Sequence, residues 1–113
     1  MSDTVTEFKQ ERETLNALIL SRENVNIKRF FGIDSAVYRD GALSARTKEL
    51  LGLVASIVLR CDDCIAYHAI QCQEIGLTDE EFDEVMSVGL VAGGSITIPH
   101  IRRAYRFWRD LKD

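Results

Sequence analysis

Apolar residues recur at helical spacing along almost the whole chain. Over residues 6–20, one face carries a stripe of apolar side chains interrupted by a single arginine: Phe8, Arg12, Leu15, Leu18 and Ile19. Most charged residues of this segment fall on the opposite face, as in an amphipathic helix. No run of alternating β-branched residues is long enough to predict a strand. The pattern therefore predicts an all-α fold of about six helices.

The middle of the chain contains a helix that is apolar on nearly every side. After a polar break at residues 21–24, a short helix is expected to be interrupted at Gly32. Ser44 is predicted to cap a helix over residues 45–60, because its hydroxyl can accept a hydrogen bond from an unpaired backbone N–H. The apolar run at the end of this helix must be enclosed, in part by a second copy of the chain. We therefore expect a homo-oligomer.

Later helix boundaries are marked by turn and capping residues. Gly76 is predicted to end one helix in the left-handed conformation. Thr78 and Glu81 have the spacing of a capping box, which begins the next helix. The glycine pair at 93–94 breaks that helix, and Pro99 fits the first turn of the last one.

Length and charge limit the possible functions. The 113 residues, 46% of them hydrophobic, suffice for one domain and are too few for two independent cores. A formal net charge of −4 lacks the broad positive field that nucleic acids require, so no nucleic-acid partner is expected. The longest apolar run, residues 50–59, is half the ~20 residues that span a bilayer. Residues 1–7 lack the features of a secretory signal, so we expect a cytoplasmic protein without a membrane partner.

Two cysteines and a histidine share a helical spacing in the segment RCDDCIAYH, residues 60–68. At about 100° per residue, Cys61, Cys64 and His68 fall within roughly 60° of one another. Cys61 lies at the helix start, where unpaired N–H groups favour a thiolate, and His68 can exchange a proton with Cys64 one turn away. After one sulfur is oxidised, the other is close enough to form a disulfide and release the product. This spacing predicts dithiol chemistry, with neither cofactor nor metal required.

Neighbouring acidic residues modify this chemistry. Glu49 lies twelve residues before Cys61. If the two helices pack antiparallel, its carboxylate reaches the thiol and imidazole face as a proton acceptor; alternatively, it is only a partner of the helix dipole. Asp62 and Asp63 place negative charge beside both sulfurs, which should raise the thiol pKa values.

These features together resemble the carboxymuconolactone decarboxylase and alkylhydroperoxidase AhpD-like superfamily. The motifs that carry the resemblance are Lys48-Glu49-Leu50, Cys61-x-x-Cys64-x-x-x-His68, Gly76, and Thr78-x-x-Glu81. It covers residues 30–107 of a single domain spanning 1–113, and is closest to small, stand-alone members with an Arg-Cys-Asp-Asp-Cys-Ile-x-Tyr-His signature and a Gly-Gly-Ser turn.

The resemblance implies a helical fold assembled into trimers or hexamers and, in the AhpD branch, reduction of hydroperoxides. By that analogy Cys64 attacks the peroxide, Cys61 resolves the product, and His68 with Glu49 relays protons. A thioredoxin-like or lipoyl dithiol protein would be the reductant. The order of the two cysteines stays open, because the helix-start argument favours Cys61 as the more acidic thiol. AhpD proteins have a histidine at the position of Asp63 in this chain. The aspartate at this position favours slow peroxidase turnover or disulfide substrates.

Less specific interpretations compete with this one. Both cysteines could be small buried hydrophobic residues, and Tyr38 and Tyr67 are interpreted as packing residues, as is Cys72. Zinc could bind three ligands of the RCDDCIAYH segment, with Cys72 or His100 as the fourth. The decarboxylase branch, which acts on a muconolactone acid, needs no dithiol. A non-enzymatic oligomeric scaffold is the last alternative.

Overall fold

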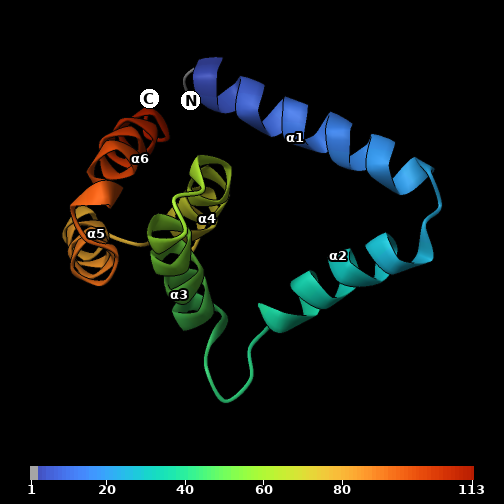
Figure 1. Cartoon of the computed structure of the whole chain (residues 1–113), viewed down its shortest axis with the longest axis horizontal. Helices are drawn as coiled ribbons and strands as arrows, with labels where there is room; N and C mark the ends of the chain where they lie inside the picture. Colours follow the sequence, from blue (N-terminus) through green and yellow to red (C-terminus); the bar gives the residue numbers. More distant parts are fainter. Residues whose placement is uncertain (1–2) are drawn as a thin grey trace.

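The computed structural model describes residues 3–113, which form six α-helices and one short 3₁₀ helix without a strand (Figure 1). In chain order the elements are α1 Asp3–Ser21, α2 Val25–Val37, α3 Ala45–Val58, α4 Asp62–Glu74, α5 Asp79–Gly93, η1 Ser95–Thr97 and α6 Ile98–Asp110. The predicted all-α class is confirmed. Among these helices, none has the length and apolarity needed to cross a membrane.

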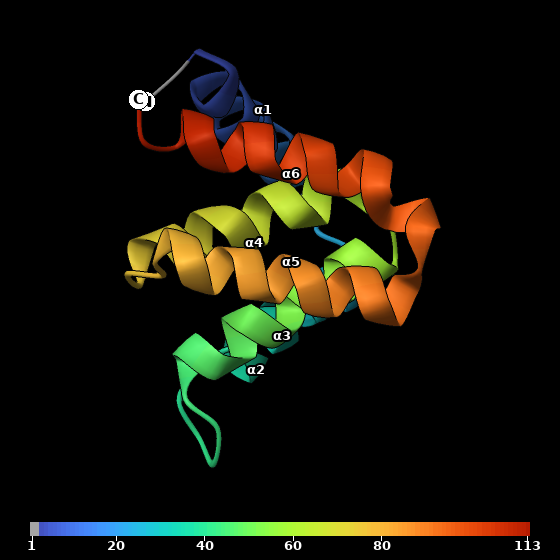
Figure 2. The same ribbon diagram turned by 90° about the vertical axis from the view of Figure 1, so that its left-hand side faces the viewer.

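Helices α3 to α6 pack together around the hydrophobic core (Figure 2). Leu53 and Ile57 of α3 and Phe82 of α5 are fully buried there. Phe82 stacks on Trp108 of α6 with ring centroids 4.4 Å apart. The indole N–H of Trp108 donates a hydrogen bond to Asp79 at 2.8 Å, which satisfies the one polar atom of this large side chain. The stacked pair thereby fixes α6 against the start of α5.

A turn of minimal length joins α3 to α4. The Arg60 N–H donates to the carbonyl of Ile57, and the Cys61 N–H donates to that of Ser56. These are the two bonds of a Schellman motif, with Arg60 at a left-handed φ of 57°. Cys61 is then the N-cap of α4, and its Sγ accepts a hydrogen bond from the Cys64 N–H at 3.2 Å. The chain therefore reverses direction at this turn, so α4 packs beside α3 and Cys61 is fixed at their junction.

Most predicted helix boundaries are confirmed. Ser44 caps α3 by accepting from the Thr47 N–H at 3.1 Å. Thr78 and Glu81 form both hydrogen bonds of the capping box, and Gly76 has a φ of 84° after the end of α4. The expected interruption at Gly32 is wrong, because α2 continues through it. One glycine costs a helix only about 1 kcal/mol, which neighbouring residues offset.

The first two helices extend away from the α3–α6 bundle (Figure 1). α1 contacts the bundle through its first half, where Val5 is buried and the Phe8 ring meets Phe107 edge-on at 5.6 Å. Farther along α1, the predicted apolar stripe is left largely uncovered, with Leu18 59% exposed. α2 has no buried residue. The apolar residues of this arm therefore lack the partners that an amphipathic pattern predicts.

Two glycine substitutions should have opposite effects on stability. A methyl group at Gly89 would lie 2.7 Å from Cγ2 and 3.0 Å from Cβ of the stiff, buried Ile57, whereas at Gly32 nothing lies within 4 Å. Gly89→Ala should lower the free energy of unfolding, because overpacking by about 1–3 kcal/mol exceeds the helix-propensity gain. Gly32→Ala should raise it by about 0.5–1 kcal/mol. Urea unfolding at fixed protein concentration measures both, and a stabilised Gly89→Ala would contradict the packing described.

Candidate functional site

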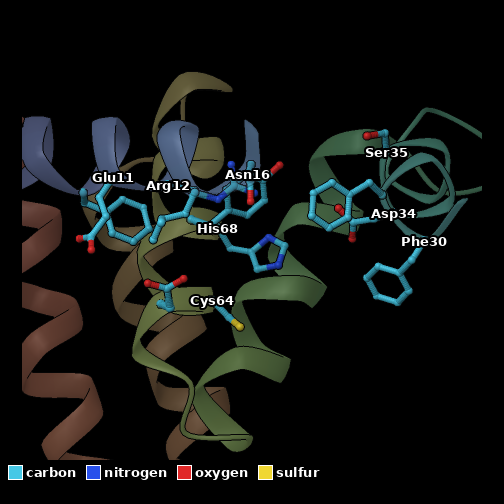
Figure 3. Close-up of a pocket in the computed structure, with 13 residues that line it drawn as sticks. Glu11, Arg12, Asn16, Phe30, Asp34, Ser35, Cys64 and His68 are labelled. Carbon is cyan, nitrogen blue, oxygen red and sulfur yellow. The ribbon is translucent and has the colours of Figure 1, made fainter. Parts of the chain in front are cut away.

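A cavity of about 670 Å³ lies between α1, α2 and the first half of α4. Figure 3 shows side chains of all three helices directed into it, with Arg12 from α1, Asp34 from α2, and Cys64 and His68 from α4. The cavity exists because the α1–α2 arm stands off the bundle. The predicted redox segment thus forms part of its wall.

Cys61 and Cys64 are joined by a disulfide, with their Cα atoms 5.3 Å apart. Cys64 is exposed and lines the cavity, while Cys61 is half-buried at the helix N-cap. The interpretation of both cysteines as small buried hydrophobic residues is therefore wrong. The first turn of α4 places one sulfur in the cavity and holds the other directly behind it.

His68 and Glu49 form a buried pair between α4 and α3. The Glu49 carboxylate accepts a hydrogen bond from Nδ1 of His68 at 2.9 Å, and the two residues are only 7% and 9% exposed, respectively. The predicted contact between the two helices is thus present, and Glu49 is more than a partner of the helix dipole. Because a carboxylate only accepts, Nδ1 carries the proton and the neutral ring keeps its lone pair on Nε2.

Two tyrosines flank the imidazole. The Tyr38 hydroxyl, from the end of α2, lies 3.5 Å from Nε2 of His68, and the Tyr67 ring meets the imidazole edge-on at 5.2 Å. Burial, followed by the charges of Glu49 and Asp34, raises the pKa of Tyr38, so its O–H remains available as a donor. Both rings therefore pack against the imidazole, as predicted, and Tyr38 in addition places its hydroxyl beside Nε2 of His68.

The helix spacing contained a signal for one of these tyrosines and none for the other. Tyr67 follows Cys64 by three residues and so shares its helical face. Tyr38 lies on another helix, thirty positions before His68. Gly52, one turn after Glu49, is a further residue that the sequence did not reveal. A methyl group there would lie 2.6 Å from Cε1 of His68 and 2.8 Å from the Tyr38 hydroxyl, so glycine lets α3 approach the imidazole.

The two aspartates beside the cysteines have different surroundings. Asp62 is bound by Nδ1 of His100 at 2.8 Å and by Nε of Arg103 at 2.9 Å. Burial acts to raise the pKa of Asp62, but these two hydrogen bonds outweigh it and lower the pKa. The negative charge expected at Asp62 is thus present but is paired with Arg103 and His100. Asp63 instead lines the cavity together with Cys64.

Cys72 is fully buried, as predicted for a packing residue. Burial, with a further contribution from Glu49 that Arg46 opposes, raises the pKa of this thiol to about 12. Within residues 3–113, no three His, Cys, Asp or Glu side chains are arranged to hold a metal ion. Because Cys72 lies in the core and His100 is paired with Asp62, the zinc alternative lacks its fourth ligand.

The three thiols should differ sharply in reactivity once the disulfide is reduced. At pH 8, a pKa of about 12 leaves about one Cys72 in ten thousand as the nucleophilic thiolate, and the side chain is inaccessible as well. Iodoacetamide should therefore add at most two labels to the folded, reduced protein, and a third only in urea. Intact-mass spectrometry counts the labels. A third label on the folded protein would contradict the burial of Cys72.

Comparison with solved structures shows which proteins this chain resembles. Two crystal structures of the Thermotoga maritima protein TM1620 are 56% and 55% identical to this chain, with TM-scores of 0.91 and 0.89. The matches cover 94% of this chain and 93% and 90% of theirs. TM1620 is a carboxymuconolactone decarboxylase family protein for which a role in the antioxidative response has been suggested.

More distant relatives extend the comparison. The carboxymuconolactone decarboxylase family protein lpg0406 of Legionella pneumophila is 22% identical over 99% of this chain and 100% of its own, and its TM-score of 0.88 shows a shared fold. An uncharacterized protein of Cupriavidus necator is 34% identical over 82 residues, which is 73% of either chain. The sequence profile of the carboxymuconolactone decarboxylase family matches residues 27–107. The chain is therefore a member of the carboxymuconolactone decarboxylase family.

Proposed function

We propose that this protein reduces hydroperoxides with its Cys61–Cys64 pair, using His68 and Glu49 to move protons. The observation that supports this most directly is the placement of Cys64, which is exposed in a cavity and disulfide-bonded to Cys61. The buried His68–Glu49 pair belongs to the same site. The antioxidative role suggested for TM1620 agrees with this chemistry.

The reaction begins with the reduced pair. The Cys64 thiolate attacks the terminal oxygen of the hydroperoxide, so an S–O bond forms, the O–O bond breaks, and the alkoxide leaves as an alcohol after taking a proton. Cys61 then attacks the Cys64 sulfenic acid, forming the disulfide and releasing water. Two electrons pass from the two sulfurs to the peroxide. The exposure of Cys64 in the cavity supports its role as the attacking sulfur, with Cys61 as the resolving one.

Protons move through the imidazole. Since Glu49 holds the Nδ1 proton, Nε2 is the atom that accepts a proton when the thiol ionises and returns it to the leaving oxygen. The Tyr38 hydroxyl, 3.5 Å from Nε2, is the polar group at that side of the ring. It keeps the imidazole oriented between turnovers.

The cycle closes when a dithiol donor reduces the disulfide, becoming oxidised itself. A thioredoxin-like or lipoyl protein in the cytoplasm is the donor class we propose, since that compartment keeps thiols reduced. The exposed Cys64 sulfur is the point of attack. A disulfide substrate would use the same pair in the same way, with exchange replacing peroxide cleavage.

Decarboxylation of a muconolactone acid is the main alternative, because it gives the family its name. That reaction needs no pair of sulfurs, so the Cys61–Cys64 arrangement favours redox chemistry. An oligomeric scaffold would need neither the sulfurs nor the buried proton-transfer pair.

A coupled peroxidase assay with several dithiol donors should separate the residue roles. Cys64→Ser should abolish turnover, and Cys61→Ser should consume about one equivalent of peroxide and stop, because nothing resolves the sulfenic acid. His68→Asn should lower kcat by about 100-fold or more. Cys72→Ala is the matched control and should retain wild-type turnover. Full activity of Cys64→Ser would overturn the proposal.

We also propose that the chain forms a homo-oligomer, with trimers or hexamers the expected states. Large apolar side chains are exposed on several helices: Phe30 is 67% exposed, Leu59 75% and Val91 86%. Exposed apolar area of this extent is typical of subunit interfaces.

Sedimentation velocity at micromolar concentration should give a mass of three or six times 12.8 kDa. Replacing Phe30, Leu59 and Val91 by Asp, one at a time, should shift the distribution toward monomer at the true interface. A wild-type monomer would contradict this expectation.

A further inference from the structure

The cavity in front of Cys64 carries an excess of negative charge. Three acidic side chains line it, one from each contributing helix: Glu11, Asp34 and Asp63. Arg12 is the only lysine or arginine among the lining residues. Three carboxylates and one guanidinium give the wall a formal charge of −2. Figure 3 shows Glu11 and Asp34 on opposite sides of the cavity, so an entering molecule meets this charge from both walls.

The one arginine is already engaged by an aromatic ring. The guanidinium carbon of Arg12 lies 4.0 Å from the centroid of the Tyr67 ring, so the guanidinium makes a cation–π contact with the face of that ring. Glu49 adds another carboxylate behind His68. Arg12 is therefore the one permanently cationic side chain in the lining, against three carboxylates, and His68 adds a positive charge only when it is protonated.

Burial and nearby charges together raise the pKa values of both tyrosines of the site. Burial is the main cause that raises the pKa of Tyr38, and the charges of Glu49 and Asp34 raise it further. Burial also raises the pKa of Tyr67, Arg12 opposes this, and Glu49 and Asp34 add to it. A negative charge is thus disfavoured on groups that share the site with Cys64.

The remaining wall is apolar and aromatic. Phe8 and Leu15 of α1 and Phe30 and Phe31 of α2 contribute to it. The volume of about 670 Å³ lies in the range of small-molecule sites.

We infer that this cavity binds uncharged or cationic substrates with an apolar group and excludes carboxylates and other anions. The inference rests on the proposed function only in taking Cys64 as the reacting group. For hydroperoxides, it selects neutral alkyl or aryl compounds over fatty-acid hydroperoxides, whose carboxylate would face the acidic side chains. Each carboxylate within several ångströms of the reacting sulfur should slow the approach of an anion about twofold at low ionic strength.

Alkylation of Cys64 by a neutral and an anionic reagent tests this without any peroxidase turnover. In each reaction an S–C bond forms and iodide leaves. The double variant Cys61→Ser/Cys72→Ala leaves Cys64 as the single thiol both in the folded protein and in urea, and it keeps an oxygen at the N-cap position, so α4 retains its cap. The ratio of the iodoacetate rate to the iodoacetamide rate is measured for the folded protein and for the same chain in urea. Because both reagents react with the same thiolate, the ratio removes the effect of any difference in the Cys64 pKa between the folded and the unfolded chain.

The ratio should be about threefold lower or more in the folded protein at low salt, and should approach the unfolded value at high salt. Asp34→Asn in the same background should raise the folded ratio about twofold. Glu84→Gln, an exposed substitution on α5 outside the cavity lining, is the matched control and should leave it unchanged.

Equal ratios for folded and unfolded chains would overturn the inference, as would a folded ratio that Asp34→Asn leaves unchanged. The outcome is separable from the proposed function. If the protein lacks peroxidase activity but still discriminates against iodoacetate, the inferred binding preference holds and the proposed reaction is wrong. If it is an active peroxidase without discrimination, the proposed reaction holds and only the inferred specificity is wrong.

Discussion

The antiparallel pairing of α3 and α4, locked by the hydrogen bond between Glu49 and His68, is the contact on which the site depends. Gly52 makes it possible, because a side chain there would collide with the imidazole. Breaking the pair would leave a buried polar group unsatisfied, at a cost of about 1–3 kcal/mol. The same pairing fixes Cys61 at the helix junction and turns Cys64 outward. A structural element of the bundle thus also orients the groups for which we propose redox and proton-transfer roles.

The second determinant is the open arrangement of the first two helices. Because α1 packs on the bundle through its first half alone, α1 and α2 enclose a cavity next to the disulfide instead of completing the core. Acidic residues of both helices then line the same cavity as Cys64, and their apolar residues are divided between the cavity and the exposed surface. The same two helices, α1 and α2, would therefore contribute both to substrate selection and to the proposed subunit contacts. The family profile matches residues 27–107 of this chain. Most of the arm formed by α1 and α2 therefore lies outside the matched segment, whereas α4 lies within it.

The aspartate pair illustrates how tertiary contacts change the meaning of a motif. In the sequence, Asp62 and Asp63 are equivalent neighbours of the cysteines. In the fold, α6 brings His100 and Arg103 to Asp62, while Asp63 stays on the cavity wall. Only one of the two charges therefore remains free to act on the sulfur and on an approaching molecule.

By itself, the sequence determined the helical class, most of the caps and the location of Cys61, Cys64 and His68, because these follow from local spacing along one chain segment. The Glu49 contact was also within reach, since two helices joined by a tight turn must pack against each other. The role of Tyr38, the space made by Gly52, the pairing of Asp62 and the acidic cavity were decided by tertiary structure alone. Each of these depends on the distance between side chains of different helices, and hydrophobic periodicity specifies which face is covered without specifying what covers it.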